Sequence, residues 1–322
     1  MILVTGATGF LGSELVMQLA SAGHSVRCIK RASSVVPVFL DPYKNNIEWV
    51  DADLLNYPAL EDAFEGVTQV YHCAAWVSLM QKDRDAMIST NVNGTANVVN
   101  LCSLNNARLV HVSSVAAIGD AKPGQMITEE HHLDPGLMHD GYATSKLESE
   151  MEVWRGIAEG LDAVIVNPSI IIGPNAGIEG SGRLFHIVKK GLKFYTRGTI
   201  GFVDVQDVAK TMILLMDSGI SEQRFIVSAE NRDYKSVVTE AANCFGIPAP
   251  QTESKPWMME VAWRAAAFWA AITGGIPAID KVSAQSASIT RNYDSSKLHK
   301  AIDIQFKPIS KAIVEVCEGL KA

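Results

Sequence analysis

The sequence predicts an α/β protein: a doubly wound parallel sheet followed by a smaller, mainly helical C-terminal lobe. Short, continuous apolar runs alternate with helical patterns over the first half of the chain, which indicates parallel strands buried on both faces and joined by right-handed crossovers. From about residue 167 the alternation loosens, and residues 232–322 are mainly helical with proline breaks. A chain of 322 residues, 48% hydrophobic and 20% charged, is long enough for one large domain or two joined ones and does not have the composition of a disordered protein.

Each predicted element has a local reason. Strands are apolar runs between turn residues, and helix ends coincide with glycine or proline: Gly23 can end the first helix, Pro58 suits the first turn of the second, and Gly66 can close it. In chain order we expect strand 2–5, helix 10–22, strands 25–30 and 47–54, a short helix from residue 58, strand 69–75, helix 83–104, strand 108–114, a helix carrying Tyr142, strand 162–170, and a strand and a helix over 201–216, the helix beginning near Asp207.

Bulk composition argues against several classes of function. The formal charge of −7, with no lysine or arginine run, is not that of a general nucleic-acid binder. The histidines do not gather at metal-ligand spacing, so we predict no metal site. The cysteines are odd in number, far apart and without a C-x-x-C pair, which is typical of reduced thiols in a cytoplasmic protein; they are Cys28, Cys73, Cys102, Cys244 and Cys317. The chain opens "MILVTG", without a basic leader, which also favours the cytoplasm.

One later segment, residues 256–275, is apolar and rich in tryptophan. Its charge-free centre, 265–272, is too short to cross a bilayer, so we expect no stable membrane insertion. Glu260 and Arg264 stand four residues apart, which suits a helix with one wet edge. The pattern favours a core helix or a helix that covers a pocket, and a membrane-surface patch is the alternative.

A glycine-rich turn, "TGATGFLG" (5–12), joins the first strand to the first helix. Gly6 permits a tight bend, Gly9 lets backbone approach a pyrophosphate, and Gly12 lets the helix lie close to the strand, while the helix N-terminus faces the phosphates. In this position the spacing predicts a dinucleotide-binding Rossmann turn more strongly than a bare structural turn. The predicted cofactor contacts here also include Thr8, Phe10 and Leu11.

The end of the second strand bears on which nicotinamide nucleotide binds. An acidic residue there would bond the 2′-hydroxyl of NAD, but this chain has Lys30 and Arg31. Two cations favour NADP(H), with NAD(H) as the alternative if they form only a solvated strand end. Asp53, after the third strand, is placed to meet the adenine together with Leu54, or it caps a helix.

The stretch "GYATSKLESE" (141–150) places Tyr142 and Lys146 four residues apart, on one face of a helix. The lysine charge favours the phenolate and so lowers the tyrosine pKa, which suits proton transfer to or from a substrate oxygen near neutral pH. Such a pair also arises by chance on solvated helices. Here "HVSS" (111–114) ends the preceding strand and brings a serine to the same sheet edge.

These motifs resemble the extended short-chain dehydrogenase/reductase family over nearly the whole chain. "STNVNGTANVV" (89–99), "NPSIIIGP" (167–174) and "FVDVQDVA" (202–209) also look like its signatures. The resemblance implies Tyr142 as acid/base, Lys146 as pKa modulator and ribose ligand, and Ser114, rather than Ser113, as the hydrogen-bond donor to the substrate oxygen. It further implies Asn91 as the residue that braces the site, and cofactor contacts from Ala74, Ala75, Pro168 and Ser169.

Within this family, the cations at the second strand end and the apolar 256–276 segment favour a dihydroflavonol-4-reductase-like branch. We therefore expect an NADP(H)-dependent reductase or alcohol dehydrogenase acting on an apolar or aromatic small molecule, with Trp76 and Ser78 in the pocket wall. A nucleotide-sugar epimerase or dehydratase with bound NAD is the first alternative, and a non-catalytic NADP(H)-binding redox sensor the second.

The sequence also predicts a division of the chain into two parts. Residues 1–168 form the dinucleotide-binding domain, to which 200–229 return, while 169–199 and 230–322 form the substrate-binding lobe. The resemblance also implies a homodimer formed through the helices at 83–104 and 140–160.

Overall fold

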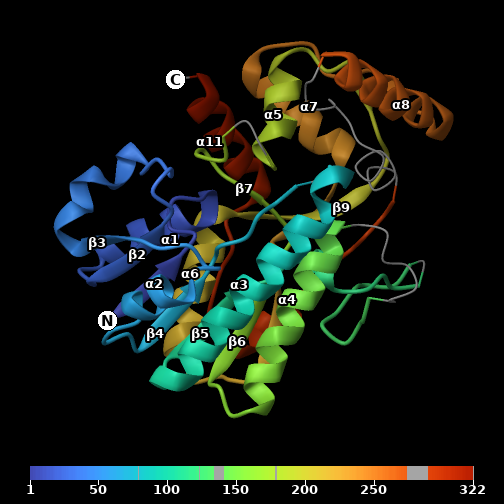
Figure 1. The fold of residues 1–322 in the computed structure, drawn as a ribbon. Coiled ribbons are helices and arrows are strands. Elements are labelled where there is room, and N and C mark those ends of the chain that lie inside the picture. The colour runs from blue at the N-terminus through green and yellow to red at the C-terminus, as the bar shows by residue number, and fades with distance from the viewer. Residues whose placement is uncertain (79, 123, 134–140, 178–179, 274–288, 322) are drawn as a thin grey trace.

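The computed structural model describes residues 1–78, 80–122, 124–133, 141–177, 180–273 and 289–321. A seven-stranded sheet with the order β10-β6-β5-β4-β1-β2-β3 forms the centre of the molecule, and all of its strand pairs are parallel (Figure 1). The predicted doubly wound parallel sheet is therefore confirmed. The strands are β1 (Ile2–Thr5), β2 (Val26–Lys30), β3 (Ile47–Asp51), β4 (Gln69–His72), β5 (Arg108–Val112), β6 (Ala163–Pro168) and β10 (Gln223–Val227).

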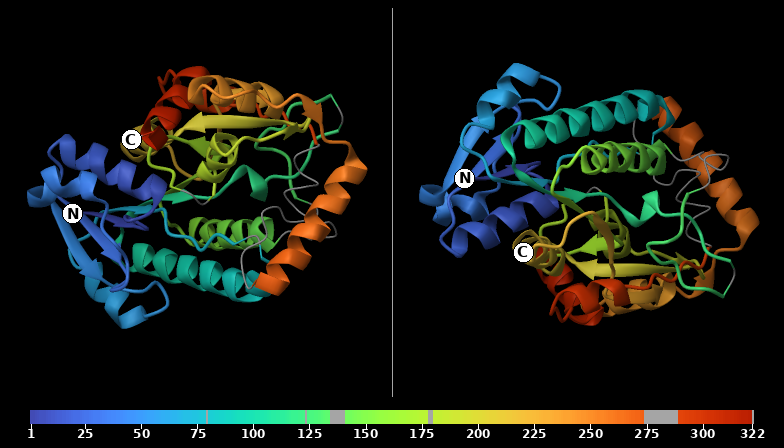
Figure 2. Two further views of the ribbon diagram at one scale, coloured as in Figure 1. Left: turned by 90° about the horizontal axis from the view of Figure 1, so that it is seen from above. Right: turned by 90° about the horizontal axis from the view of Figure 1, so that it is seen from below.

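Helices cover both faces of this sheet (Figure 2). One face packs against α1 (Phe10–Ser21) and α6 (Val205–Asp217), and the other against α2 (Tyr57–Ala63), α3 (Arg84–Asn105) and α4 (Gly141–Ala158). Two separate buried clusters result, one on each face. The strands read as continuous apolar runs because both of their faces are buried. Among the described residues, 3₁₀ helices lie in the connections at Val38–Asn46, Gln81–Asp83 and Val115–Ala117.

Segments from the second half of the chain form a smaller lobe with its own core. A sheet of the order β11-β9-β7 and a pair of strands, β12 and β8, pack with α5, α7 and α11 around a third buried cluster. The sequence predicts β9, as the strand expected at the start of 201–216, but not β10 or the other short strands of this lobe, because their apolar runs are short or interrupted by charged residues. Its elements are β7 (Ile170–Ile172), α5 (Gly182–Lys189), β8 (Phe194–Tyr195), β9 (Thr199–Asp204), β11 (Glu230–Asp233), α7 (Tyr234–Phe245), β12 (Thr252–Glu253) and α11 (Ile309–Lys321). Helix α10 (Ser296–Ala301) packs instead beside β10, and its Leu298 belongs to a buried cluster of the central sheet.

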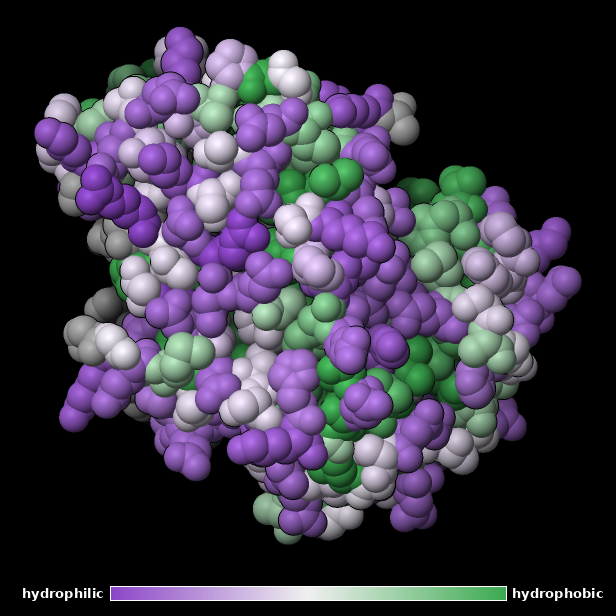
Figure 3. Space-filling model, turned by 180° about the vertical axis from the view of Figure 1, so that it is seen from behind, coloured by the Kyte–Doolittle hydropathy of each residue, from purple (hydrophilic) through white to green (hydrophobic). Residues whose placement is uncertain are grey.

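Helix α8 (Pro256–Thr273) corrects one expectation. The sequence favours a core or pocket-covering helix here, but Trp257, Phe268 and Trp269 are each about two-thirds exposed, at 65%, 68% and 68%. The core interpretation is therefore wrong, because the large apolar side chains of α8 point outward. Among the described residues, no helix has the length and hydropathy needed to cross a membrane. The face of the molecule in Figure 3 is mainly hydrophilic, with apolar side chains in separate patches.

Candidate active site

The predicted site residues come from elements that meet at one edge of the central sheet. β1, β4 and β5 are adjacent parallel strands, so the segments that follow them emerge at the same edge. Gly6 follows β1, Ala74 follows β4, and Ser114 follows β5. Helix α4 carries Tyr142 and Lys146. The Lys146 ammonium donates to the carbonyl of Val112, the last residue of β5, so this part of α4 lies near the same edge. The topology therefore brings the glycine turn and the proton-transfer residues to the place where open α/β sheets bind ligands.

The glycine turn is closely packed. Gly6 has φ +66°, and a Cβ on it would lie 2.6 Å from the backbone nitrogen of Ala74. A Cβ on Gly12 would lie 2.1 Å from the carbonyl oxygen of Gly6, so α1 crosses directly against the turn. Helix α1 begins after Gly9 without a side-chain cap, which leaves first-turn N–H groups for another acceptor. This arrangement fits a dinucleotide pyrophosphate at the helix N-terminus.

A cavity of about 410 Å³ opens beside this turn. Thr8, Gly9 and Phe10 line one side, and residues 37–39 line the other. A cavity of about 920 Å³ lies elsewhere, between α4, β10 and α10. The glycine turn forms a wall of the first cavity, whereas neither this turn nor Tyr142 lines the larger one.

The two cations after β2 differ in their surroundings. Lys30 forms an ion pair with Asp51 on the neighbouring strand β3. Arg31 is exposed, and its side chain makes no ion pair or hydrogen bond with the part of the chain that the structure describes. Arg27, earlier on β2, is paired with Glu48. Of these three cations, Arg31 is thus the one available to a phosphate.

Asn91 on α3 links the loop after β4 to α4. Its side-chain oxygen accepts the N–H of Trp76 at 2.7 Å, and its Nδ2 donates to the Trp76 carbonyl at 2.9 Å and to Ser145 Oγ at 2.8 Å. Asn91 is buried, so these bonds hold in a low-dielectric environment. The predicted bracing residue therefore connects the backbone of Trp76 to the helix of Tyr142.

The two serines after β5 face different surroundings. Ser113 is buried and its hydroxyl donates to Glu150 Oε2 at 2.6 Å. Ser114 is partly exposed, and its Oγ accepts the N–H of Ala116 at 3.1 Å. Because that contact uses only a lone pair, the Ser114 proton remains available for a substrate oxygen. This geometry favours Ser114 over Ser113 as the substrate-binding serine.

Lys146 is buried beneath the site, and its ammonium group donates to the Val112 carbonyl at 3.0 Å. Burial lowers the pKa of this group to about 8, and the negative charge of Glu150 partly opposes the shift. Tyr142 is half-buried on the preceding turn of α4. The lysine therefore stays largely protonated near neutral pH, one turn from the phenol.

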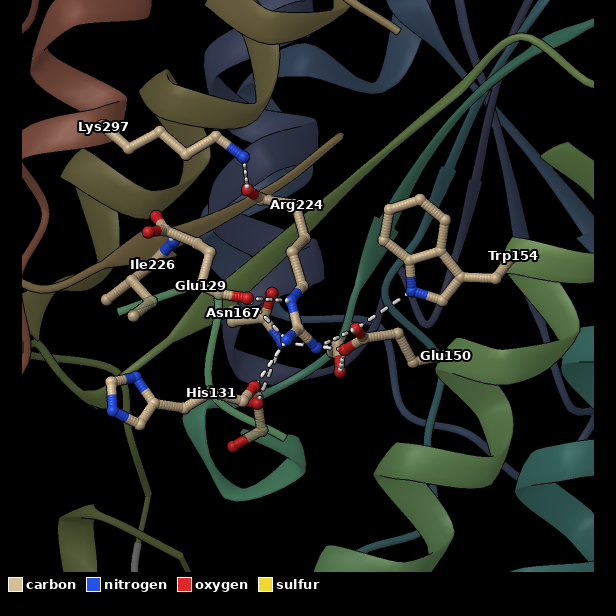
Figure 4. Close-up of polar contacts among 10 residues, drawn as sticks. Glu129, His131, Glu150, Trp154, Asn167, Arg224, Ile226 and Lys297 are labelled. Atoms are coloured by element: carbon tan, nitrogen blue, oxygen red, sulfur yellow. Dashed lines mark hydrogen bonds and ion pairs between the residues drawn. The ribbon is translucent and has the colours of Figure 1, made fainter. Parts of the chain in front are cut away.

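Glu150 lies one turn further along the same helix and is the centre of a polar network that the sequence analysis did not identify (Figure 4). Its carboxylate forms a buried ion pair with Arg224 on β10 at 2.9 Å and accepts bonds from Ser113 and from Asn167 on β6, the latter at 2.8 Å. Trp154 Nε1 also donates to it, at 3.2 Å. Helix α4 is thereby fixed to three strands of the sheet.

Arg224 extends this network to the chain before α4. Its guanidinium donates to the carbonyl oxygens of Glu129 at 2.6 Å and His131 at 2.7 Å, while the Glu129 carboxylate accepts the N–H of Ile226 (Figure 4). The sequence around Glu150 is "KLESE", which contains two glutamates after Lys146. This stretch does not show which of the two is buried and fully paired.

Two buried histidines lie on adjacent strands below the site. His72 shares hydrogen bonds with Thr5 Oγ1 at 2.7 Å and Thr95 Oγ1 at 3.1 Å, and its ring centroid lies 5.2 Å from that of His111. Burial, with a smaller contribution from the charge of Lys146, lowers the pKa of His72 to about 3. Both effects also lower the pKa of His111. These rings are therefore neutral at physiological pH. The described residues include no cluster of three or more metal-ligating side chains.

The remaining predicted residues lie around this edge with other partners. Asp53 Oδ1 accepts the N–H of Leu55 at 2.9 Å, so Asp53 stabilises the turn before α2, whereas the helix cap that the sequence left open for it is Asn56. The Leu54 side chain packs against Gly94 of α3. Pro168 ends β6, and Ser169 follows it with its hydroxyl directed to the Val227 carbonyl. Ser78 donates to Asp83 at 2.7 Å, so its proton is already used within the loop before α3.

Comparison with known proteins agrees with this geometry. Residues 2–228 match the model of the "NAD dependent epimerase/dehydratase family". The chain is 31% identical to a "Putative dihydroflavonol 4-reductase" of Synechocystis sp. over 97% of this chain and 92% of that protein. It is 32% identical to "Tetraketide alpha-pyrone reductase 2" of Arabidopsis thaliana over 73% and 80% of the two chains. The crystal structure of gox2253 superimposes with a TM-score of 0.86 at 26% identity, over 100% of this chain and 98% of the other.

Proposed function

The chain belongs to the NAD-dependent epimerase/dehydratase family, among the extended short-chain dehydrogenases/reductases, and we propose that it is an NADP(H)-dependent carbonyl reductase or alcohol dehydrogenase. The substrate is the carbonyl or secondary alcohol of an apolar or aromatic small molecule. The observation that carries the proposal is the placement of Lys146 on α4, buried against the end of β5, with Tyr142 one turn before it and Ser114 following the same strand.

In the direction of reduction, the substrate oxygen gains a proton as its carbon gains a hydride, which the bound nicotinamide supplies. Ser114 donates a hydrogen bond to the substrate oxygen, and Tyr142 transfers its proton to that oxygen. The positive charge of Lys146 favours the phenolate that remains. Asn91 and Glu150 act through these groups, because they hold the Trp76 loop and helix α4 in place.

The cofactor is assigned to the glycine turn and the adjacent strand ends. Gly6, Gly9 and Gly12, with Thr8, Phe10 and Leu11, would hold the pyrophosphate. Asp53 and Leu54 would border the adenine, and Arg31, with Lys30 in a lesser role because of its ion pair, would bind the 2′-phosphate. Ala74, Ala75, Pro168 and Ser169 would border the nicotinamide, and Lys146 would also reach the ribose.

The substrate class rests on the pocket wall and on the names of the relatives. Trp76 is 40% exposed and hydrogen-bonded to Asn91, so it presents an aromatic surface near the site. Two relatives are named as reductases of a dihydroflavonol and of a tetraketide α-pyrone, which are aromatic or cyclic carbonyl compounds. We assign substrate binding to 169–199 and 230–322 and dinucleotide binding to 1–168 and 200–229, in a cytoplasmic homodimer.

The proposal is tested with purified protein, NADPH or NADH, and a panel of aromatic and aliphatic aldehydes and ketones. We expect oxidation of NADPH with at least one member of the panel. Tyr142→Phe should abolish this turnover and leave NADPH affinity nearly unchanged. Intact nucleotide binding without turnover of any carbonyl would instead favour the redox-sensor alternative.

The family name supports one competing activity, the epimerisation or dehydration of a nucleotide sugar with bound NAD. This alternative is tested on the same preparation with UDP-glucose and dTDP-glucose. Conversion of either sugar without net consumption of added NADPH would overturn the reductase proposal. Arg31 argues for the reductase, since the 2′-hydroxyl of NAD gives no charge for it to bind.

A further inference from the structure

Helix α8 carries a continuous apolar stripe on its outward side. Trp257, Val261, Phe268 and Ile272 are spaced so that they share one face of the helix, and they are 65%, 59%, 68% and 63% exposed. The charges of Glu260 and Arg264 lie to one side of the stripe and are paired with each other. Single exposed apolar residues are ordinary, but a stripe along four turns of one helix indicates an interaction surface.

The stripe is not the exposed edge of a hydrophobic core. No described residue of α8 belongs to any of the four buried apolar clusters. The helix lies at the periphery of the molecule in all three ribbon views, at the end away from the N-terminus (Figures 1 and 2). The apolar surface is therefore the convex side of one helix. It offers no groove for a partner's helix or peptide, and it suits the acyl region of a lipid layer better.

Unpaired cations border the start of this helix. Lys255 directly precedes α8, and strand β12 before it pairs with β8, which brings the exposed Lys193 and Phe194 close by. Residues 182–200 contain no acidic residue, although the whole chain has a formal charge of −7. Their cations are Arg183, Lys189, Lys190, Lys193 and Arg197. The side chains of Lys190, Lys193 and Lys255 make no hydrogen bond or ion pair within the described parts of the chain.

We propose that α8 and this basic rim form a docking face for an anionic lipid bilayer, on which α8 lies in the plane of the interface. Aromatic and aliphatic side chains would enter the acyl boundary while Lys190, Lys193 and Lys255 meet lipid phosphates. Self-association through α8 is the competing occupant of this face, and the oligomer mass measured below distinguishes the two. The proposal concerns the location of the enzyme and does not depend on which substrate it reduces.

The test is co-sedimentation of the full-length protein with vesicles of phosphatidylcholine alone, or of phosphatidylcholine mixed with phosphatidylglycerol. We expect binding to the mixed vesicles that weakens as salt is raised. The double variant Val261→Asp/Phe268→Asp should bind at least about tenfold more weakly, since it places two charges in the acyl boundary. Leu104→Asp is the matched control, because Leu104 at the end of α3 is 69% exposed and lies on another element.

The rim is tested separately. Lys190→Ala/Lys193→Ala should lose affinity for the mixed vesicles roughly thirtyfold, whereas Lys44→Ala/Lys122→Ala, at exposed lysines elsewhere, should lose little. Thermal unfolding and NADPH binding of every variant establish that it is folded. Absence of vesicle binding by the unmodified protein would overturn the proposal. So would equal binding by the α8 variant, or an α8 variant that changes only the oligomer mass in sedimentation velocity.

Discussion

At the scale of single residues, the proposed preference for NADP(H) rests on one arginine. Lys30 is already neutralised by Asp51, whereas Arg31 has no such partner within the described residues. Arg31→Ala should therefore weaken NADPH binding about tenfold to hundredfold, the worth of a charge-assisted bond, and leave NADH binding unchanged. Lys30→Ala should have a smaller effect. Nucleotide fluorescence titration measures both constants, and an equal loss for NADPH and NADH would contradict the assignment.

The two serines after β5 provide a matched pair. Ser114→Ala should lower kcat by about a hundredfold or more, because it removes a donor to the reacting oxygen, and should hardly change stability. Ser113→Ala should instead lower the free energy of unfolding by about 1–3 kcal/mol, because it removes a buried donor to the Glu150 carboxylate. Steady-state kinetics and urea denaturation separate the two effects. The reverse result would move the catalytic role to Ser113.

We expect the buried ammonium of Lys146 to lower the free energy of unfolding, although the proposed reaction needs its charge. Its folded pKa of about 8 is below the usual 10.5, so between these values the unfolded chain binds more protons and stability rises with pH. Below pH 8 the full cost, about 3 kcal/mol, is present. Lys146→Met should therefore be more stable than the parent at pH 7, by about 2 kcal/mol after loss of the bond to Val112, and much less active.

Urea denaturation of the ligand-free proteins from pH 7 to pH 10 measures this effect. The advantage of the methionine variant should shrink through that range as the parent lysine loses its proton. A methionine variant that is less stable than the parent at pH 7, with no change in the difference at higher pH, would show that burial of this ammonium is not costly.

At the scale of elements, helix α4 is positioned by an ion pair rather than by apolar packing alone. Glu150 and Arg224 are both buried, so removing one charge leaves the other without compensation. Glu150→Gln should lower the free energy of unfolding by about 3–5 kcal/mol and reduce kcat, because Tyr142 and Lys146 lie on the same helix. Glu148→Gln, two residues away and without such a network, should stay within about 0.5 kcal/mol of the parent. Equal stability of the two variants would contradict this role.

Some strands of the central sheet can be predicted from the sequence and others cannot. The strands of the central sheet from β1 to β6 were predictable because each has several apolar residues between turn residues, and most of them are largely buried. The edge strand β10 was not, since "QRFIV" has a charged residue at its second position, and the role of this Arg224 appears only when it meets Glu150 from a distant helix. Helix α6 begins at Val205, slightly before the position expected from Asp207, because Asp204 caps it.

At the scale of the whole molecule, the fold was predictable because local motifs specify it, and the same motifs suggested the candidate site residues. The glycine turn and the Tyr142–Lys146 spacing are each contained within one strand–helix junction or one helix turn. The pairing of Lys30 with Asp51, the inward direction of Ser113 and the outward face of α8 were not predictable. These features depend on contacts between segments far apart in sequence, which no local pattern contains.

The central claim is that this molecule moves a hydride from NADPH to a carbonyl carbon while Tyr142 protonates the oxygen. The most direct test uses NADPH deuterated at C4 and mass spectrometry of the alcohol formed from a reactive carbonyl. We expect deuterium on the former carbonyl carbon with the parent enzyme and none above background with Tyr142→Phe. An alcohol that contains no deuterium from either face of the labelled nicotinamide, or labelling that persists at the parent rate in Tyr142→Phe, would contradict it.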